Sequence, residues 1–323
     1  MKLHLKGLRI AFFGTSDFAA YHLFVLIHCS IHKIVAIFTQ ESIKIKQKSS
    51  ILSIHTISQI NNILLFQSYF LSQSQINHII KNLNIDIIIV VSYGVILSQE
   101  ILHIPKLGCI NIHGSLLPRW RGPAPIQRAL EHGDTMTGIS IIQMNSNIDT
   151  GDILHSTPCK ISPKDTSYTL SKKLACIGSI ALLKTIEKII LGTCKNIPQD
   201  TSNITYAYKL NKKEAHINWN KSAIEIERRI RAFNPWPVSY FKIKNQYIRV
   251  WNAEINKNSI NTDQYNDFQP GTILKTHPNG IYVITGSGII ILTVLQISGK
   301  KKIHVKDLMN AYSSLFTMHS VLT

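Results

Sequence analysis

Short apolar runs alternate with amphipathic segments along the first part of the chain. The apolar runs predict strands at residues 8–13, 34–39, 86–92, 109–113 and 138–144, and segments with caps and helical periodicity predict helices at 18–27, 126–132 and 169–191. The run Asp86-Ile-Ile-Ile-Val-Val-Ser is mostly β-branched, as is typical of a parallel strand covered on both faces. The alternation predicts an α/β domain with a Rossmann-like, doubly wound, mostly parallel sheet.

The remainder of the chain has a different pattern. Residues 193–211 mix Asn, Pro, Gln, Asp, Ser and Lys with little periodicity, which predicts a linker. Ser222-Ala-Ile-Glu225 forms a capping box at the start of a helix, and short strands are predicted at 238–243, 247–253, 271–275, 280–285 and 289–297. We therefore expect a first domain at 1–192, a linker at 193–211, and a smaller OB-like β-barrel domain at 212–323.

Charge and cysteine content narrow the class of protein. The chain has 323 residues and a formal charge of +17, which favours a polyanionic partner such as nucleic acid or a lipid surface. Abundant Ile, Asn and Lys, which A/T-rich codons encode, offer an alternative source of this excess. Five cysteines without a C-x-x-C spacing favour a reducing cytoplasm, and no apolar stretch approaches the roughly eighteen residues that span a bilayer. We expect a cytoplasmic protein with no membrane attachment.

Three polar residues form the candidate active site. Asn111 and His113 alternate along a predicted strand, so both project to one side of it, at the end where open α/β sheets bind ligands. Asp149 follows in a later loop. An isolated Asn-x-His tripeptide often only caps a strand, and the neighbouring residues decide between these interpretations.

Two reaction classes fit an amide, an imidazole and a carboxylate in one pocket. These are acyl transfer with an oxyanion hole and hydrolysis by a general base. Ser115 lacks the glycines of a nucleophile elbow, so the nucleophile must come from the substrate. Asn111 can donate an N–H to a developing oxyanion, His113 can donate or shuttle a proton, and Asp149 can orient that histidine or hold a water. The single glycine of the first turn, Gly14, gives little support to a dinucleotide site.

A longer motif surrounds these residues and is specific enough to indicate a family. The chain resembles the methionyl-tRNA formyltransferases through Asn111-x-His113-Gly114-Ser115-Leu116-Leu117-Pro118-Arg119-Trp120-Arg121-Gly122-x-Ala124-Pro125-Ile126-Gln127, Asp149-Thr150-Gly151-Asp152 and Arg231-Ala232-Phe233-Asn234-Pro235-Trp236-Pro237. The Asn/His/Asp set is shared with other formyltransferases and related hydrolases that use 10-formyltetrahydrofolate. The C-terminal matches are more specific to the tRNA enzymes.

The resemblance implies roles for particular residues. Asn111, His113 and Asp149 are expected to be catalytic, and Ser115, Leu116, Leu117 and Pro118 to line the site of 10-formyltetrahydrofolate, which serves as co-substrate. The neutral amino group of the esterified methionine is expected to attack the formyl carbon while Asn111 and protonated His113 stabilise the oxyanion. His28 and His32 sit four positions apart and could in principle share a metal, but no carboxylate accompanies them, so no metal is expected.

The basic C-terminal domain is expected to bind the initiator methionyl-tRNA, with the enzyme acting as a monomer. Residues in positions to contact its phosphates are Lys209, Lys212, Lys213, Arg228, Arg229, Arg231 and Lys300 to Lys302. The resemblance also gives a role in probing the acceptor stem to residues 41–50, which contain Lys44, Lys46 and Lys48 but none of the Pro, Gly and Arg usual in the family. Because of this departure, we expect the protein to distinguish initiator from elongator tRNA less strictly, or to do so in a different way.

Two alternatives remain open at this point. One keeps the folate chemistry but formylates a small amine, such as a nucleotide sugar or a purine precursor. The other is a non-catalytic RNA-binding protein that retains a Rossmann-like domain as a relic. The 231–237 motif disfavours the first alternative, and the complete Asn111, His113 and Asp149 set disfavours the second.

Overall fold

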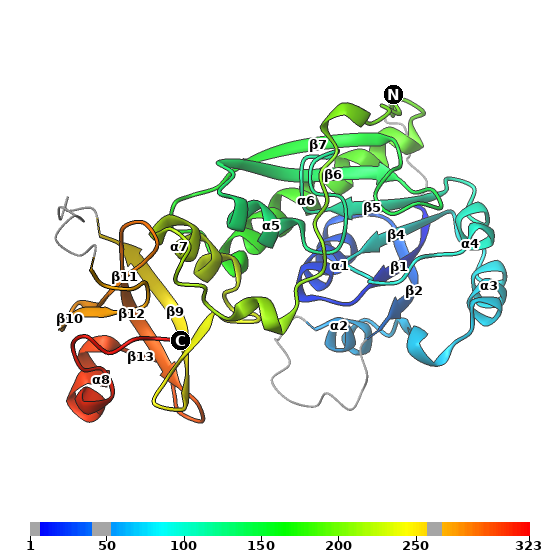
Figure 1. The fold of residues 1–323 in the computed structure, drawn as a ribbon. Helices are drawn as coiled ribbons and strands as arrows, with labels where there is room; N and C mark the ends of the chain where they lie inside the picture. Colours follow the sequence, from blue (N-terminus) through cyan, green and yellow to red (C-terminus); the bar gives the residue numbers. More distant parts are fainter. Residues whose placement is uncertain (1–6, 41–52, 257–266) are drawn as a thin grey trace. The chain divides into compact units, whose positions relative to one another are not determined.

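The computed structural model describes residues 7–40, 53–256 and 267–323. It divides into two compact units (Figure 1). The first unit comprises Met1–Pro125, Met136–Lys160 and Ser171–Tyr208, and the second comprises Ile126–Thr135, Ile161–Leu170 and Lys209–Thr323. Each unit has its own sheet and its own core.

The first unit is built on a seven-stranded sheet with strand order β3-β2-β1-β4-β5-β6-β7. In this order, neighbouring strands from β3 through β2, β1 and β4 to β5 pair in parallel, whereas β6 and β7 form an antiparallel edge. The strands are β1 (Arg9–Gly14), β2 (Lys33–Thr39), β3 (Leu64–Gln67), β4 (Ile87–Val91), β5 (Cys109–His113), β6 (Met136–Gln143) and β7 (Ile153–Lys160). The mostly parallel, Rossmann-like sheet predicted from the sequence is confirmed.

Helices cover both faces of this sheet. Alternate residues of β1 and β4, such as Phe13 and Ile88, pack against α3 (Gln73–Asn82) and α4 (Gln99–His103). The opposite face is covered by α1 (Asp17–Cys29) and α6 (Ser167–Ile190), where a Cβ atom built on Gly178 of α6 would meet both His22 of α1 and Ile139 of β6. Because both faces are covered, β4 is buried along its whole length. Before α6, the described residues also form α2 (Ile54–Ile60), the short η1 (Ser68–Phe70) and α5 (Pro125–His132).

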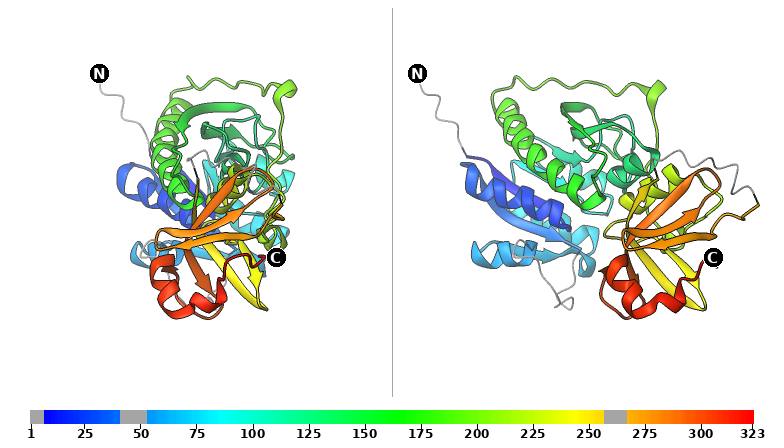
Figure 2. Two further views of the ribbon diagram at one scale, coloured as in Figure 1. Left: turned by 60° about the vertical axis from the view of Figure 1, so that its left-hand side comes forward. Right: turned by 90° about the vertical axis from the view of Figure 1, so that its left-hand side faces the viewer.

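The second unit contains a curled antiparallel sheet (Figure 2). Its strand order is β10-β11-β12-β9-β8, and β13 pairs with β12. Its strands are β8 (Tyr240–Ile243), β9 (Gln246–Ile255), β10 (Ile273–His277), β11 (Gly280–Ile284), β12 (Ile289–Ile297) and β13 (Ile303–His304). Two helices, α7 (Ala223–Ala232) and α8 (Val305–Tyr312), pack on the apolar interior of the sheet with Trp219, Phe241 and Phe316. The predicted small barrel-like domain is therefore present.

The last residues of the chain lie between the two edge strands of this sheet. Ser320 accepts a hydrogen bond from the Ile273 N–H at 2.9 Å, and Leu322 donates to the carbonyl of Gly271 at 2.9 Å. On the other side, Thr323 donates to the carbonyl of Lys242 at 3.0 Å. This segment satisfies backbone groups of both edges, which would otherwise be open to pairing with another chain.

The predicted capping box of α7 is confirmed. The Ser222 hydroxyl accepts from the Glu225 N–H at 3.3 Å, and the Glu225 carboxylate accepts from the Ser222 N–H at 3.0 Å. Hydrogen bonds from Ser222 to the carboxylate lower the pKa of Glu225 to about 2. Across the described ranges, none of the helices combines the length and apolar character needed to cross a bilayer.

Candidate active site

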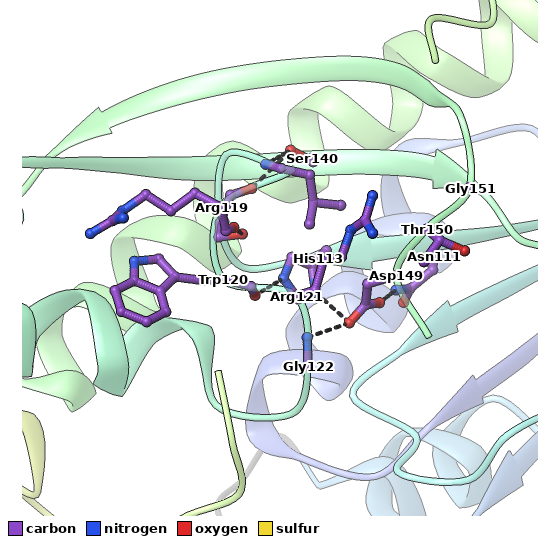
Figure 3. Close-up of polar contacts among 12 residues, drawn as sticks. Asn111, His113, Arg119, Trp120, Arg121, Gly122, Ser140, Asp149, Thr150 and Gly151 are labelled. Carbon is purple, nitrogen blue, oxygen red and sulfur yellow. Dashed lines mark hydrogen bonds and ion pairs between the residues drawn. The ribbon is translucent and has the colours of Figure 1, made fainter. Parts of the chain in front are cut away.

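Strand β5 presents two of the predicted residues from the interior of the sheet. It pairs in parallel with β4 and antiparallel with β6, so Asn111 lies between Val90 and Ile142. Ile110 and Ile112 point to the opposite face and are buried. Asn111 and His113 consequently project together at the carboxyl end of the parallel strands, as Figure 3 shows.

The loop between β6 and β7 brings the third predicted residue to the same place. Asp149 accepts a hydrogen bond from the Asn111 side-chain amide at 3.0 Å on one carboxylate oxygen. Its other oxygen accepts from the Gly122 N–H at 2.8 Å and lies 3.4 Å from Nδ1 of His113 (Figure 3). Side-chain exposure is only 11% for Asp149 and 5% for His113, so water screens these contacts weakly.

His113 is held on both sides of its ring. Nδ1 faces the Asp149 carboxylate, and Nε2 lies 2.8 Å from the carbonyl oxygen of Trp120. A carbonyl oxygen only accepts hydrogen bonds, so Nε2 carries a proton in this arrangement. Trp120 has a φ of +64°, a left-handed conformation that is uncommon for a bulky residue and that fixes where its carbonyl points.

The loop after β5 is tied to itself and to β6. The Ser115 hydroxyl donates to the Arg119 carbonyl at 2.6 Å. Ser140 of β6 accepts from the Leu117 N–H at 3.0 Å and donates to the Ser115 carbonyl at 2.8 Å. Of the four residues expected to line the folate site, Ser115 and Leu117 are buried, while Leu116 and Pro118 are partly exposed. The Ser115 hydroxyl therefore acts within the loop and fixes its shape.

Gly122 occupies a position that other residues fill poorly. Its φ is +119°, and a Cβ atom built on it would lie 2.8 Å from the Ala207 carbonyl oxygen. The glycine lets the chain pass closely against residue 207 while its N–H points at Asp149. A backbone donor to the carboxylate therefore depends on the absence of a side chain here.

Gln199 is a site residue that the sequence did not indicate, because it lies in the segment predicted as a linker. Its side-chain amide donates to the carbonyls of Asp149 at 2.9 Å and Gly151 at 2.8 Å. Its oxygen accepts from Nε of Arg121 at 3.0 Å and from a terminal nitrogen of the same guanidinium at 2.7 Å. One side chain thus joins the Asp149 loop to the loop after β5. No short-range pattern signals this role.

The predicted tRNA-contacting residues lie in different surroundings. Lys209, Lys212, Lys213 and Lys300 to Lys302 are exposed, and Lys302 lies 4.9 Å from the centre of the Trp251 ring. The Arg229 guanidinium lies 3.5 Å from the Glu131 carboxylate and over the Phe233 ring. Arg228 donates to the His132 carbonyl at 3.4 Å. Arg231 forms a two-point ion pair with Glu227. Lys44, Lys46 and Lys48 fall outside the described residues. Arg231 also donates to the Asp165 carbonyl at 3.0 Å, so its contacts hold α7 to the segment that contains residue 165.

Within the described ranges, no three His, Cys, Asp or Glu side chains gather as a metal site would require. The site described above consists of hydrogen-bond donors and one carboxylate.

Comparison with known proteins assigns the chain to a family. A family model described as formyl transferase matches residues 8–186, and one described as formyl transferase, C-terminal domain, matches residues 209–313. The methionyl-tRNA formyltransferase of Blochmanniella pennsylvanica (strain BPEN) is 63% identical over 99% of both chains. The chain belongs to the methionyl-tRNA formyltransferase family. The resemblance drawn from the motifs is thereby confirmed.

A second relative resembles the chain in sequence, and two solved structures resemble it in fold. The methionyl-tRNA formyltransferase of Wigglesworthia glossinidia brevipalpis is 47% identical over 98% of both chains. The solved methionyl-tRNA formyltransferase from Clostridium thermocellum superimposes with a TM-score of 0.55 at 17% identity, over 78% of this chain and 96% of that one. WlaRD, a sugar 3N-formyl transferase, superimposes with a TM-score of 0.63 at 21% identity, over 92% and 100%. These two structures share the family fold with this chain.

Proposed function

We propose that this protein transfers the formyl group of 10-formyltetrahydrofolate to the α-amino group of methionyl-tRNA, with the initiator tRNA as its substrate. The observation that carries the proposal is the contact of Asn111 and His113 with the Asp149 carboxylate, in a chain of this family that matches its relatives over nearly the full length. The site holds donors and a base but no nucleophilic side chain in a recognisable setting, which suits a reaction whose nucleophile is an amine.

The proposed reaction makes one bond and breaks one. The amine nitrogen bonds to the formyl carbon, and the bond from that carbon to N10 of the folate breaks. Negative charge develops on the formyl oxygen before the second bond breaks. One proton leaves the amine and one is delivered to N10, so the groups near the formyl carbon must stabilise an oxyanion and accept a proton.

Asn111 is proposed to donate to the formyl oxygen. Its side-chain nitrogen carries two hydrogens, and the hydrogen bond to Asp149 uses one of them. The second hydrogen is then held in a fixed direction by the first. A preorganised donor of this type contributes about 2.7–4 kcal/mol where its removal has been measured in other enzymes.

His113 is proposed to supply the second donor. The Nε2 proton is held by the Trp120 carbonyl in this structure, and we propose that the formyl oxygen takes its place when the substrates bind. Nδ1 faces the Asp149 carboxylate at 3.4 Å, and we propose that His113 acts with a proton on both nitrogens. The positive charge of the His113 ring then stabilises the negative charge that develops on the formyl oxygen.

Asp149 is proposed to assist removal of the amine proton, directly or through a water. Its carboxylate already accepts hydrogen bonds from Asn111 and Gly122, which keep it oriented. The same carboxylate orients Asn111 and His113, so it connects the two donors to the proton acceptor. A single substitution here disturbs all three functions.

The co-substrate is proposed to bind along the loop of residues 115–118, with the loop shape fixed by Ser115 and Ser140. Leu116 and Pro118, which are partly exposed, are the side chains available for apolar contact with the folate. The exposed lysines Lys209, Lys212 and Lys213, together with Arg229, are proposed to contact tRNA phosphates. We further propose that the protein acts in the cytoplasm as a monomer.

The proposal is tested by incubating the purified protein with radiolabelled 10-formyltetrahydrofolate and one acceptor at a time: methionyl initiator tRNA, methionyl elongator tRNA, or a small-amine pool of amino sugars linked to nucleotides and purine-precursor amines. We expect label to appear on methionine attached to the initiator tRNA. Label on the small amines alone would contradict the tRNA substrate while leaving the folate chemistry in place. Binding of tRNA with no label transfer would support a non-catalytic RNA-binding protein.

A further inference from the structure

Two tyrosine side chains are exposed on the segment that borders the candidate active site. Tyr206 is 55% exposed and Tyr208 is 72% exposed. Their ring centroids lie 6.2 Å apart with an interplanar angle of 27°, so the rings are stacked rather than splayed. Between them, Ala207 is fully buried. The alternation places both rings on one side of an extended segment, away from its buried side.

The backbone of this segment is fixed against the loop after β5. Arg121 donates to the Thr205 carbonyl at 2.9 Å and accepts from the Ala207 N–H at 2.7 Å, which forms a bridge between Arg121 and Tyr206. The next residue after Arg121 is Gly122, whose N–H binds Asp149. Tyr206 is therefore joined to the catalytic carboxylate through two consecutive residues of one loop.

Cationic side chains follow the two tyrosines in the sequence and stand on the loop that pairs with Thr205. Lys209 follows Tyr208 directly in the sequence, and Lys212 and Lys213 come soon after; all three are exposed. On the loop side, Trp120 donates its N–H to the Thr205 hydroxyl at 2.8 Å, and the Arg119 guanidinium lies 4.5 Å from the centre of the Trp120 ring. Exposed aromatic rings flanked by cations are the combination that binds single-stranded nucleic acid.

We propose that Tyr206 and Tyr208 form a stacking surface for the unpaired nucleotides at the 3′ end of the tRNA. This inference rests on the proposed function. The reacting amine is esterified to the 3′-terminal ribose, so the last nucleotides must pass close to Asp149 when the amine reaches it. Unpaired bases present a π face that stacks on tyrosine whatever the base, and Lys209, the next residue after Tyr208, can attract a phosphate between them. The pair holds the 3′ end and aligns the amine.

The test compares Tyr206→Leu and Tyr208→Leu, which remove the ring, with Tyr206→Phe and Tyr208→Phe, which keep it. Initial rates are measured against methionyl-tRNA at saturating 10-formyltetrahydrofolate, and against the folate at saturating tRNA. Each Leu variant should raise KM for methionyl-tRNA by about tenfold, as expected for the loss of one base-to-ring stack. The Phe variants should stay near wild type, and KM for the folate should not change.

Phe24→Leu is the matched control, because Phe24 is an exposed ring of α1 that stacks on His28 with centroids 4.2 Å apart. It should leave both KM values unchanged. A direct readout uses tRNA with 2-aminopurine among the unpaired 3′ nucleotides: binding should quench its fluorescence in wild type and less so in the Leu variants. Thermal unfolding of each variant shows whether it is folded. If Tyr206→Leu is not folded, Tyr208→Leu, at the more exposed position, provides the test.

Three results would overturn the inference. One is an unchanged KM for methionyl-tRNA and unchanged quenching in both Leu variants. Another is a rise in KM for the folate instead of the tRNA, which would assign the rings to the co-substrate. A third is a Phe variant as defective as the Leu variant, which would assign the role to the hydroxyl. In each case, formylation of methionyl-tRNA by the wild-type protein would show that the proposed function stands. If the wild-type protein did not formylate methionyl-tRNA, both the proposed function and the stacking surface would lose their basis.

Discussion

Gln199 donates its side-chain amide to the main-chain carbonyl of Asp149 at 2.9 Å, across fifty positions of sequence. The same amide binds the Gly151 carbonyl, and the side-chain oxygen accepts two hydrogen bonds from Arg121. Asp149 has a φ of +53°, so its loop adopts a conformation that costs free energy without such support. The position of the carboxylate therefore depends on a residue outside the motifs that indicated the site.

Replacing Gln199 is expected to lower turnover more than binding. Gln199→Glu keeps an acceptor for Arg121 but removes the donors to the Asp149 loop, while Gln199→Ala removes both. We expect kcat to fall about 10- to 100-fold in both variants, since small displacements of catalytic groups have effects of this size. KM for each substrate should stay within a small factor of wild type. Gln99→Ala, at an exposed position of α4, is the control.

A second prediction concerns the backbone donor to Asp149. Gly122→Ala would place a Cβ atom 2.8 Å from the Ala207 carbonyl oxygen, at a φ of +119°. The loop must shift, and the hydrogen bond from residue 122 to Asp149 should be lost. We expect kcat to fall by about tenfold or more. Gly299→Ala also has a positive φ but open space around it, so it should leave kcat unchanged; equal loss in both variants would contradict the role of Gly122.

The buried His22 predicts an acid-dependent loss of stability. Its Nδ1 lies 2.7 Å from the Phe18 carbonyl, its Nε2 has no partner among the described residues, and burial lowers its pKa to about 4. The unfolded chain binds a proton at this histidine more readily than the folded chain does. The contribution of the neutral, buried His22 to the free energy of unfolding is therefore fully present above pH 6.5 and is lost as the pH falls toward 4. Its full size is about 3 kcal/mol.

Urea unfolding of wild type and His22→Asn at pH 7.5 and 4.5 measures this contribution. The difference in free energy of unfolding between the two pH values should be smaller in the variant by about 2 kcal/mol or more. His28→Asn is the control, because His28 makes the same type of contact with the Phe24 carbonyl but is exposed. An identical pH dependence in wild type and His22→Asn would refute the buried neutral state.

The basic residues of the second unit should separate into two groups. Lys212→Gln and Lys213→Gln should each weaken tRNA binding and lower the slope of log affinity against log salt by about 1, as loss of one phosphate contact does. Arg231→Gln should instead lower the thermal stability, because it breaks the pairing with Glu227 and Asp165. Lys81→Gln, on α3, is the control. A flat salt response in wild type would argue against phosphate contacts.

The sequence indicated the parts of the molecule that depend on local pattern. Alternation in residues 109–113 gave β5 its bounds and placed Asn111 and His113 on one side, and a cap with Glu225 three residues later marked the start of α7. Strand β7 was not predicted: it holds Pro158, a residue that is confined to edge strands such as this one. The stretch from α2 to α3 was also missed, although Ser72 and Gln75 form a capping box there.

Contacts between distant positions were beyond the reach of these patterns. Gln199 binds partners 50 and 78 positions away, and nothing in its neighbours marks it. Trp120 contributes its carbonyl and Gly122 its N–H, and backbone groups have no signature in a sequence. The ion pair of Arg231 is a different case, because Glu227 lies four positions earlier on the same helix, a spacing at which ion pairs form and which the sequence shows.

The most direct test of the account is single-turnover formyl transfer to methionyl-tRNA by Asn111→Ala, His113→Ala and Asp149→Asn, with Asp307→Asn on α8 as the control. Each of the three site variants should retain its fold and bind tRNA, while its rate of formyl transfer should fall by a factor on the order of 10² or more. The control should react at the wild-type rate. A near-normal rate in any one of the three would contradict the assignment of that residue, and near-normal rates in all three would place the chemistry elsewhere in the molecule.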